Sequence, residues 1–177
     1  GSTNAALHLP AIANEAGINF TLEDVTKISK KTPYIADLKP GGKYVAKDLY
    51  EIGGVPVLIK ALLDGGYLHE NCMTVSGKTI GENHKDIVFP SGQKVIYKTS
   101  KPLSRTGGFV GLKGNLAPEG AIVKVAGMKR KKFKGKAKCF DGEPSALNAV
   151  LEKKIKSGDV IIIRYEGPRG SPGMPEM

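Results

Sequence analysis

The sequence predicts an α+β fold with a helical first half and a β-rich second half. In the first half, apolar residues recur every three or four positions between glycines, which is typical of amphipathic helices. In the second half, short β-branched runs alternate with Gly- and Pro-rich breaks, which is typical of strands joined by turns. One helical pattern precedes the last of these runs. We therefore expect a barrel or sandwich in the second half, and a domain boundary near residues 84–92.

The first helix is predicted from residues at its two ends. Ser2, Thr3 and Asn4 are all good N-cap residues, because their side chains can accept hydrogen bonds from free backbone N–H groups. Gly17 is expected just after the helix, where glycine readily adopts the left-handed conformation. Pro10 lies inside the pattern and should kink the helix or delay its start.

Three further helices follow in the first half. Thr21 and Asp24 have capping-box spacing and predict a second helix. A short helix is expected within residues 45–52, and a stronger one runs from Gly53-Gly54 to Gly65-Gly66. The residues expected to face inward in the helices of this half are Leu9, Ile12, Ala13, Ala16, Leu22, Val25, Ile28, Leu58, Ile59, Leu62 and Leu63.

The second half is predicted from its β-branched runs. The expected strands are residues 94–97, 108–112, 121–125, 133–140 and 160–163. Pro144 suits the first turn of a helix that Ser157-Gly158 would close. Its inward face would carry Leu147, Val150, Leu151 and Ile155. The final run, Val160–Ile163, is expected to be a buried strand that leads into a Gly- and Pro-rich tail.

Composition limits the function classes. The chain has 177 residues, of which 40% are hydrophobic and 25% charged, as expected for a globular protein. No apolar run approaches the ~20 residues of a membrane span, and the start lacks the pattern of a signal peptide. Cys72 and Cys139 have no CxxC spacing, which favours a reducing compartment and argues against a structural zinc site. We expect a cytoplasmic protein, or one of an organelle matrix or stroma in a eukaryote, without a membrane partner.

The net charge of +10 depends strongly on the run Lys129–Lys138. Such a run could bind the phosphates of a nucleic acid. The alternative is a solvated edge strand, in which lysines discourage pairing with another sheet. Only 6% of the residues are aromatic and there is no tryptophan, so bases would have few side chains on which to stack. The solvated edge is the favoured interpretation.

The motifs that could carry chemistry are weak. Gly77-Lys78-Thr79 resembles the end of a phosphate-binding loop, but Cys72 stands where that loop needs its first glycine. The three histidines share no metal-ligand spacing. Lysines around Cys139 could lower its thiol pKa, yet no general base is close in sequence. These residues alone do not define a reaction.

Six ordered segments, together spanning nearly the whole chain, carry a resemblance to a known family. They are Gly1-Ser-Thr-Asn-Ala-Ala-Leu-His8, Ala36-Asp-Leu-Lys-Pro-Gly-Gly-Lys-Tyr-Val45, Gly53-Gly-Val-Pro56, Cys72-Met-Thr-Val-Ser-Gly-Lys-Thr79, Gly114-Asn-Leu-Ala-Pro-Glu-Gly120 and Tyr165-Glu-Gly-Pro-Arg-Gly-Ser-Pro-Gly-Met-Pro-Glu-Met177. The chain thereby resembles the dihydroxy-acid dehydratases, within the superfamily that includes sugar-acid and phosphogluconate dehydratases. The second and fifth segments favour the dihydroxy-acid enzymes.

The resemblance implies a hydro-lyase that converts 2,3-dihydroxy-3-methyl acids to 2-oxo acids in valine and isoleucine biosynthesis. In this family an iron–sulfur cluster acts as Lewis acid on the leaving 3-hydroxyl, Mg²⁺ holds the substrate, and a serine alkoxide removes the C2 proton. Metal ligation offsets the charge that develops on both oxygens. The resemblance also implies a homodimer, no nucleic-acid partner and a swivelling β/β/α barrel.

The resemblance assigns few functional residues to this chain. Glu176 matches the Mg²⁺-binding glutamate of the family, and Ser2, Thr3 and Asn4 start a helix near the family's active-site region, where they could help to bind the substrate anion. The family's cluster cysteines lie upstream, so neither Cys72 nor Cys139 corresponds to one, and its serine base lies downstream. No catalytic residue is expected here, and the 177-residue chain alone is predicted to be inactive.

The resemblance also implies a division of the chain. Residues 1–88 would be the helical end of the cluster-binding domain, and residues 89–177 a truncated, barrel-like C-terminal domain. Two other hypotheses remain open. One is a sugar-acid dehydratase of the same superfamily. The other, of a different class, is a basic nucleic-acid-binding module that uses Lys129–Lys138.

Overall fold

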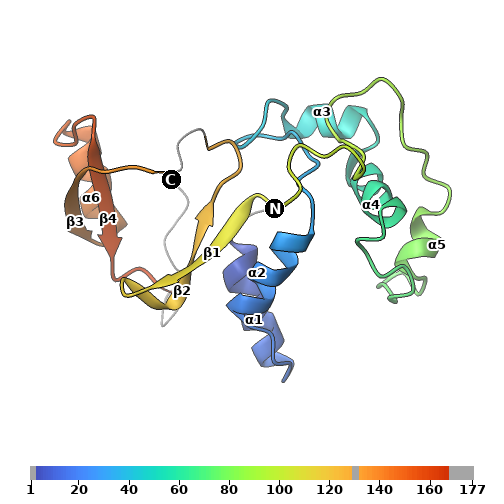
Figure 1. The fold of residues 1–177 in the computed structure, drawn as a ribbon, viewed down its shortest axis with the longest axis horizontal. Coiled ribbons are helices and arrows are strands. Elements are labelled where there is room, and N and C mark those ends of the chain that lie inside the picture. The colour runs from blue at the N-terminus through green and yellow to red at the C-terminus, as the bar shows by residue number, and fades with distance from the viewer. Residues whose placement is uncertain (1–2, 129–131, 168–177) are drawn as a thin grey trace. The chain divides into compact units, whose positions relative to one another are not determined.

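The computed structural model describes residues 3–128 and 132–167, and these form a mixed α+β structure (Figure 1). The predicted α+β class is therefore confirmed. By its internal contacts the chain divides into two compact units, residues 1–129 and 130–177. The helices are α1 (Ala5–Glu15), α2 (Leu22–Lys31), α3 (Ala46–Glu51), α4 (Gly54–Asp64), α5 (Ile80–His84) and α6 (Glu143–Leu151), and the strands are β1 (Phe109–Gly114), β2 (Ala117–Lys124), β3 (Lys136–Asp141) and β4 (Asp159–Arg164).

The first two helices begin and end close to where the sequence predicts. Pro10 lies inside α1, and Gly17 follows that helix with a φ of 68°. Thr21 and Asp24 form the predicted capping box of α2, in which the Thr21 backbone N–H donates to Asp24 Oδ2 at 2.9 Å. The α2 helix lies against β1 (Figure 1).

A small hydrophobic core lies within the first unit. Its buried members are Ile35, Ala61, Val95 and Ile96. The extended segments before α3 and after α5 meet here through antiparallel bridges, one of which pairs Ala36 with Ile96. The predicted strand 94–97 is therefore present only as an isolated bridge. Its backbone is held partly by the Gln93 side chain, whose Oε1 accepts from the N–H groups of Val95 and Ile96 at 2.8 and 2.9 Å.

A tight loop of the first unit folds around the buried carboxylate of Asp37. The Lys43 backbone N–H donates to Asp37 Oδ1 at 3.1 Å, and the Tyr44 N–H donates to the Asp37 carbonyl at 2.9 Å. A Cβ atom on Gly42 would lie 2.3 Å from the Asp37 carbonyl carbon. The close approach of these backbone segments therefore requires glycine at position 42.

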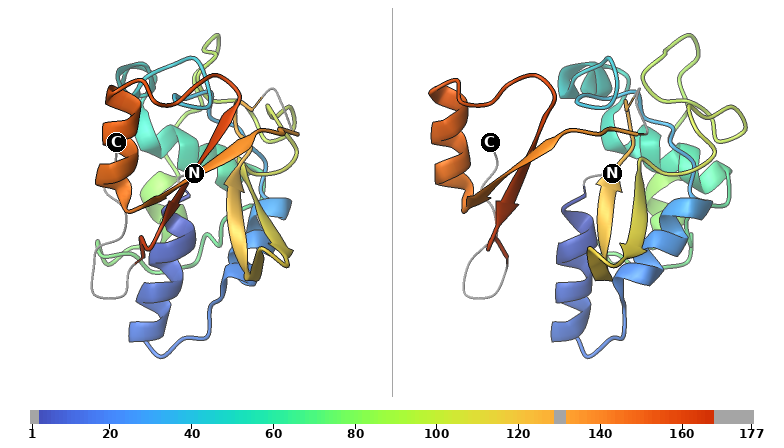
Figure 2. Two further views of the ribbon diagram at one scale, coloured as in Figure 1. Left: turned by 90° about the vertical axis from the view of Figure 1, so that its left-hand side faces the viewer. Right: turned by 60° about the vertical axis from the view of Figure 1, so that its left-hand side comes forward.

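The four described strands form two separate sheets. Strands β1 and β2 pair antiparallel in the first unit, and β3 and β4 pair parallel in the second. In the second unit, α6 joins β3 to β4 and packs beside both strands (Figure 2). A parallel pair needs such a crossover connection. No closed barrel forms among residues 3–128 and 132–167, so the α+β structure is incomplete as predicted, and the boundary between residues 88 and 89 stays a prediction.

The structure corrects the predicted length and inward face of α6. The helix ends at Leu151, well before Ser157-Gly158, and Lys153 adopts a left-handed φ of 57°. Its buried residues are Glu143, Ala146 and Ala149, whereas the predicted inward residues Leu147, Val150 and Leu151 are exposed. Small alanine side chains let the helix approach its strands closely, and the larger residues point away from them.

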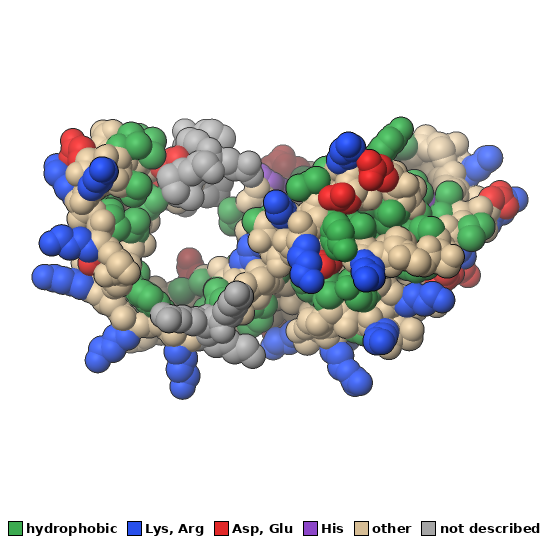
Figure 3. Space-filling model, turned by 90° about the horizontal axis from the view of Figure 1, so that it is seen from above, with side chains coloured by type: hydrophobic (Ala, Val, Ile, Leu, Met, Phe, Trp, Pro, Cys, Tyr) green, Lys and Arg blue, Asp and Glu red, His purple; other side chains and the backbone are tan. Residues whose placement is uncertain are grey.

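Other predicted inward residues are also exposed in this chain. In β4, Ile161 and Ile162 are 40% and 39% exposed, so the predicted burial of this strand is wrong for the chain as described. Leu9 and Ile12 of α1 and Ile28 of α2 are exposed as well. Figure 3 shows hydrophobic side chains between spread Lys and Arg side chains on one face. Within the described residues, no helix is long and apolar enough to cross a membrane.

Candidate functional site

The structure describes only part of the predicted substrate- and metal-binding set. Thr3 and Asn4 lie at the start of α1, where the Leu7 and His8 N–H groups both donate to the Asn4 carbonyl at 3.0 Å. Asn4 has helical φ and ψ and makes no side-chain capping bond to the helix. Ser2 and Glu176 lie outside the described residues, so the structure does not show whether the predicted residues come together.

At the carboxyl ends of β3 and β4, polar side chains connect the two strands shortly before the part of the sequence that contains Glu176. The β-ladder ends at the register pair Asp141 and Arg164. Arg164 donates through both Nε and its terminal nitrogen to Asp141 Oδ1, at 2.8 and 2.6 Å. Hydrogen bonding to Asp141 raises the pKa of Arg164. In parallel sheets, this is the edge at which ligand sites are commonly built.

The chain beyond β4 is fixed against the start of α6. The Glu143 backbone N–H donates to Glu166 Oε1 at 2.7 Å, and the Gly142 N–H donates to the Arg164 carbonyl at 3.0 Å. Between these contacts Tyr165 adopts a left-handed φ of 61°, which is unusual for a bulky residue. The backbone thus turns sharply at the root of the tail, immediately before the segment that carries the predicted Mg²⁺ ligand.

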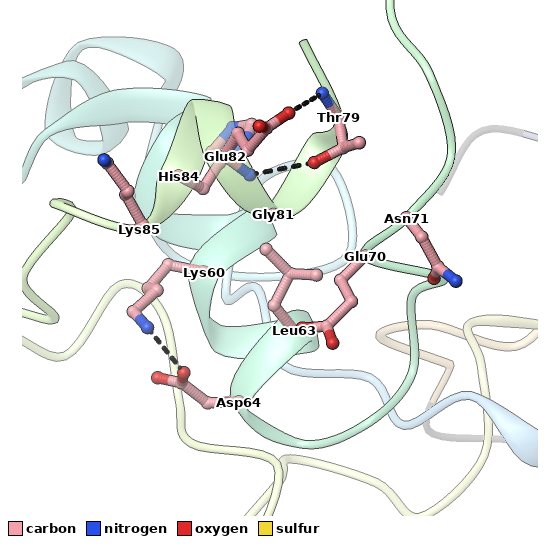
Figure 4. A pocket seen from close by; sticks show the side chains of 10 residues that line it. All are labelled: Lys60, Leu63, Asp64, Glu70, Asn71, Thr79, Gly81, Glu82, His84 and Lys85. Atoms are coloured by element: carbon pink, nitrogen blue, oxygen red, sulfur yellow. Dashed lines mark hydrogen bonds and ion pairs between the residues drawn. The ribbon is translucent and has the colours of Figure 1, made fainter.

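The pocket between α4 and α5 in the first unit has polar walls, and its charged residues Lys60, Asp64 and Glu82 have partners within their own helices or caps. The pocket has a volume of about 660 Å³. Figure 4 shows Lys60 reaching Asp64, with 2.7 Å between Lys60 Nζ and Asp64 Oδ1. It also shows Glu82 accepting from the Thr79 backbone N–H, at 2.7 Å. Lys60, Asp64 and Glu82 thus stabilise the helices on which they lie.

The segment Gly77-Lys78-Thr79 forms a turn that leads into α5. In this turn the Thr74 N–H donates to the Lys78 carbonyl at 3.0 Å, and Thr79 then caps α5. The α5 helix has only five residues, and among the described residues the segment before the turn forms no named strand, only an isolated bridge between Met73 and Thr79. This geometry agrees with the rejection of a phosphate-binding loop.

The metal groups that the resemblance implies, an iron–sulfur cluster and Mg²⁺, need thiolate or oxygen ligands that lie close together. Within residues 3–128 and 132–167, no group of three or more His, Cys, Asp or Glu side chains is arranged to hold a metal ion. Cys72 and Cys139 are both free and exposed. The described side chains therefore do not supply a ligand set for an iron–sulfur cluster or Mg²⁺.

The described part of the lysine run begins at residue 132 and continues into β3. Lys138 forms an ion pair with Asp159 at 2.8 Å, and this hydrogen bond lowers the pKa of the Asp159 carboxyl. Lys132, Lys134 and Lys136 are exposed. The pairing of Lys138 links the middle of β3 to the first residue of β4, so one lysine of the run has a structural partner.

Sequence reasoning missed three residues that organise the structure around these segments. Asp37 and Gln93 hold loops of the first unit, and Glu166 holds the exit of β4. For Asp37, an acidic residue shortly before Pro-Gly-Gly could have indicated a tight loop. For Glu166 the available signal was Gly142, because a glycine before a helix supplies no capping side chain and an acceptor must come from elsewhere.

Comparison with known proteins gives a consistent result along the chain. Residues 1–83 match the model of the dihydroxy-acid/6-phosphogluconate dehydratase N-terminal domain, and residues 94–177 match the model of the C-terminal domain. The whole chain is 62% identical to "Dihydroxy-acid dehydratase 2" of Mesorhizobium japonicum and 66% identical to "Dihydroxy-acid dehydratase" of Pelagibacter ubique. A similarly named protein of Saccharolobus islandicus is 52% identical.

These relatives are much longer than the chain. All of its residues align, but they cover only 30% of the Mesorhizobium protein, 31% of the Pelagibacter protein and 32% of the Saccharolobus protein. The two family models match on either side of residues 84–93, and both describe the same family. The resemblance inferred from the six motif segments is thus confirmed, and the chain belongs to the dihydroxy-acid/6-phosphogluconate dehydratase family.

Proposed function

We propose that this chain is a segment of a dihydroxy-acid dehydratase, a hydro-lyase that converts 2,3-dihydroxy-3-methyl acids to 2-oxo acids in valine and isoleucine biosynthesis. The observation that carries this proposal is the 62–66% identity, along the entire chain, to relatives named dihydroxy-acid dehydratase. Because the chain covers only about a third of those relatives, we assign the activity to the full-length protein.

We propose that the full-length protein uses an iron–sulfur cluster and Mg²⁺, as the family resemblance implies. Glu176 is the one residue of this chain that we assign to Mg²⁺. A carboxylate is a suitable ligand because this hard cation prefers oxygen. Ser2, Thr3 and Asn4 keep their predicted role in binding the substrate anion. The described residues end shortly before Glu176, where Arg164 pairs with Asp141 and Glu166 accepts from the Glu143 N–H.

The experiment that tests this proposal replaces Glu176 in the full-length protein. Glu176→Gln keeps the size of the side chain but removes the charge, and we expect the Mg²⁺ concentration for half-maximal activity to rise about tenfold or more, by analogy with the loss of groups that support metal ligands. Binding of Mn²⁺, followed by electron paramagnetic resonance, gives a readout that does not depend on turnover. Glu152→Gln, which removes an exposed carboxylate after α6, is the matched control.

Unchanged metal affinity in Glu176→Gln would refute the assignment of this residue. The substrate class is decided separately, by comparing the rates with dihydroxyisovalerate and with sugar acids such as phosphogluconate. A clear preference for the sugar acids would replace the proposed substrate while keeping the family. The proposed homodimer is tested by light scattering of the full-length protein.

The nucleic-acid hypothesis requires its own test. Binding of duplex or single-stranded DNA should weaken steeply with salt if lysines contact phosphates. Replacement of Lys132, Lys134 and Lys136, which are exposed, should then abolish that binding. We expect no such binding, because the similarity to dehydratases covers the lysine run as well as the rest of the chain.

A further inference from the structure

One face of the β3–β4 sheet lies toward α6, which packs beside both strands (Figure 2). Side chains alternate between the two faces along a strand, so Lys138 and Phe140 share a face with Ile163, the register partner of Phe140. Phe140 and Ile163 are half-buried. Lys138 Nζ donates to the carbonyl of Lys154, shortly after α6, at 2.5 Å. This face of the sheet is therefore the one that α6 covers.

The opposite face of the sheet consists of Ala137, Cys139, Val160 and Ile162, and we call these four residues the open face. They form two neighbouring register pairs, Ala137 with Val160 and Cys139 with Ile162. Ala137 and Cys139 are exposed, and Ile162 is 39% exposed. Cysteine behaves as a small apolar residue, so all four side chains favour burial. The centre of this sheet thus presents an uncharged, apolar surface to water.

The sequence of β4 has the pattern of a strand that is buried on both faces. Its residues 160–163 are four consecutive β-branched residues, without the polar and apolar alternation of a half-solvated strand. Parallel sheets occur almost only with both faces covered. The helix α6 supplies one cover for this parallel pair. Residues 132–167, the described part of the second unit, supply no cover for the open face.

The missing cover is best supplied by the same polypeptide. A two-stranded sheet is marginal in water without further strands or packing on its faces, so its cover must be present whenever the unit is folded. The chain covers only 30% of the Mesorhizobium relative, so most of such a protein lies outside these 177 residues. A segment of the full-length protein meets this requirement better than a partner that binds and dissociates.

We propose that the open face is an internal interface of the full-length protein, covered by an apolar segment that lies outside residues 1–177. The sequence-based prediction of a buried β4 then holds for the full-length protein, although it is wrong for this chain by itself. The inference goes beyond the proposed function and shares with it only the premise that the chain is part of a longer protein. It uses neither the substrate nor Mg²⁺.

Cys139 lies at the centre of the open face, and its thiol reports directly on the cover. In the native full-length protein we expect a maleimide to modify Cys139 about 100-fold more slowly than in the same protein in urea, because modification requires local opening. Mass spectrometry of the peptides measures both rates. Ser157→Cys, in the exposed turn before β4, is the matched control and should react at similar rates in both states.

Modification of Cys139 in the native protein as fast as in urea would overturn the proposal. The same result in a protein with full dehydratase activity would leave the proposed function intact, so the two failures are distinguishable. This experiment uses the natural thiol of Cys139 and therefore does not depend on the folding of a variant at the open face.

A photo-crosslinker at position 162 identifies the cover. Ile162 is replaced in the full-length protein by an aliphatic amino acid that carries a diazirine, which on irradiation inserts into the group that it touches. We expect a product of monomer mass whose crosslinked peptide lies outside residues 1–177. A product of dimer mass would assign the open face to a second copy, and a peptide within residues 1–177 would assign it to this chain. Either result would overturn the proposal.

Discussion

At the scale of single residues, Asp37 and Gly42 show how one loop of the first unit depends on close backbone approach. The Asp37 side chain is buried, with a 7% exposed fraction, and one of its oxygens accepts from the Lys43 N–H. Gly42 lies directly over Asp37, with no room for a side chain between them. The motif Asp-Leu-Lys-Pro-Gly-Gly-Lys, which helped to identify the family, therefore has a clear physical basis in this loop.

Gly42→Ala should destabilise the first unit, because the new Cβ would lie within 2.6 Å of three Asp37 atoms. Overpacking of this kind typically costs about 1–3 kcal/mol. Urea denaturation should show the loss as a lower midpoint. Gly114→Ala is the matched control, since a Cβ there meets nothing within 4 Å. Equal midpoints for the two variants would contradict the proposed packing of the loop.

At the scale of secondary-structure elements, α6 shows why an apolar pattern does not decide which face is buried. Leucines and valines dominate the predicted inward face, yet Ala146 and Ala149 are the apolar residues that pack inward. Spacing alone cannot choose between the two faces, because both carry apolar residues. Contact with β3 and β4 makes that choice, and contacts with other parts of a longer protein could in turn cover the leucines.

Ala146→Leu tests the inward face of α6. Ala146 is 3% exposed, so the larger side chain should strain the helix–sheet contact and cost about 1–3 kcal/mol of stability. Leu147→Ala, at a neighbouring position that is 42% exposed, should change stability by about 0.5 kcal/mol or less. Thermal unfolding of the two variants provides the comparison. A larger loss for Leu147→Ala would show that α6 packs on the face predicted from the sequence.

The short helix α5 is a second example at this scale, because the stability that its capping box provides depends on pH. Glu82 accepts from the Thr79 N–H, and this hydrogen bond lowers the pKa of the Glu82 carboxyl. The pKa of the Glu82 carboxyl is therefore lower in the folded state than its ordinary value of about 4.3 in the unfolded state. The ionised carboxylate stabilises the fold at pH values above that ordinary pKa. This stabilisation is lost as the pH falls through the lower pKa of the folded state. The box therefore stabilises α5 at neutral pH.

Glu82→Gln should lower the melting temperature at neutral pH, and the difference from the wild type should vanish at strongly acid pH, where Glu82 is protonated in both folded and unfolded states. Melting curves between neutral and strongly acid pH measure this effect. Thr79→Ser, which keeps the capping hydroxyl, is the control and should retain the wild-type pH profile. A difference for Glu82→Gln that stays constant with pH would argue against an ionised cap.

At the scale of the whole molecule, many large apolar side chains are exposed in the 177-residue chain. Leu7 and Ile12 of α1 are 63% and 64% exposed, and Leu116 is 95% exposed. Exposed apolar surface commonly marks contact regions. The relatives are about three times as long as this chain, so surfaces of this kind are available for contacts with the remaining parts of such a protein.

The purified 177-residue chain is expected to show no dehydratase activity. The resemblance places the family's cluster cysteines upstream of this sequence and its serine base downstream of it. Assay of dihydroxyisovalerate dehydration, after incubation with Mg²⁺ and cluster-reconstitution reagents, checks this expectation. The full-length protein is the positive control. Turnover by the isolated chain would show that the catalytic groups lie within these residues.

The sequence by itself determined the α+β class, the positions of most helices and the family. Caps, prolines and glycines act over a few residues, and the six motifs need no knowledge of tertiary contacts. The tertiary structure decided which faces are buried, placed the strands in two separate sheets, and joined Glu166 to the start of α6. Such contacts form between residues far apart in the chain, so their energies depend on packing and not on local pattern.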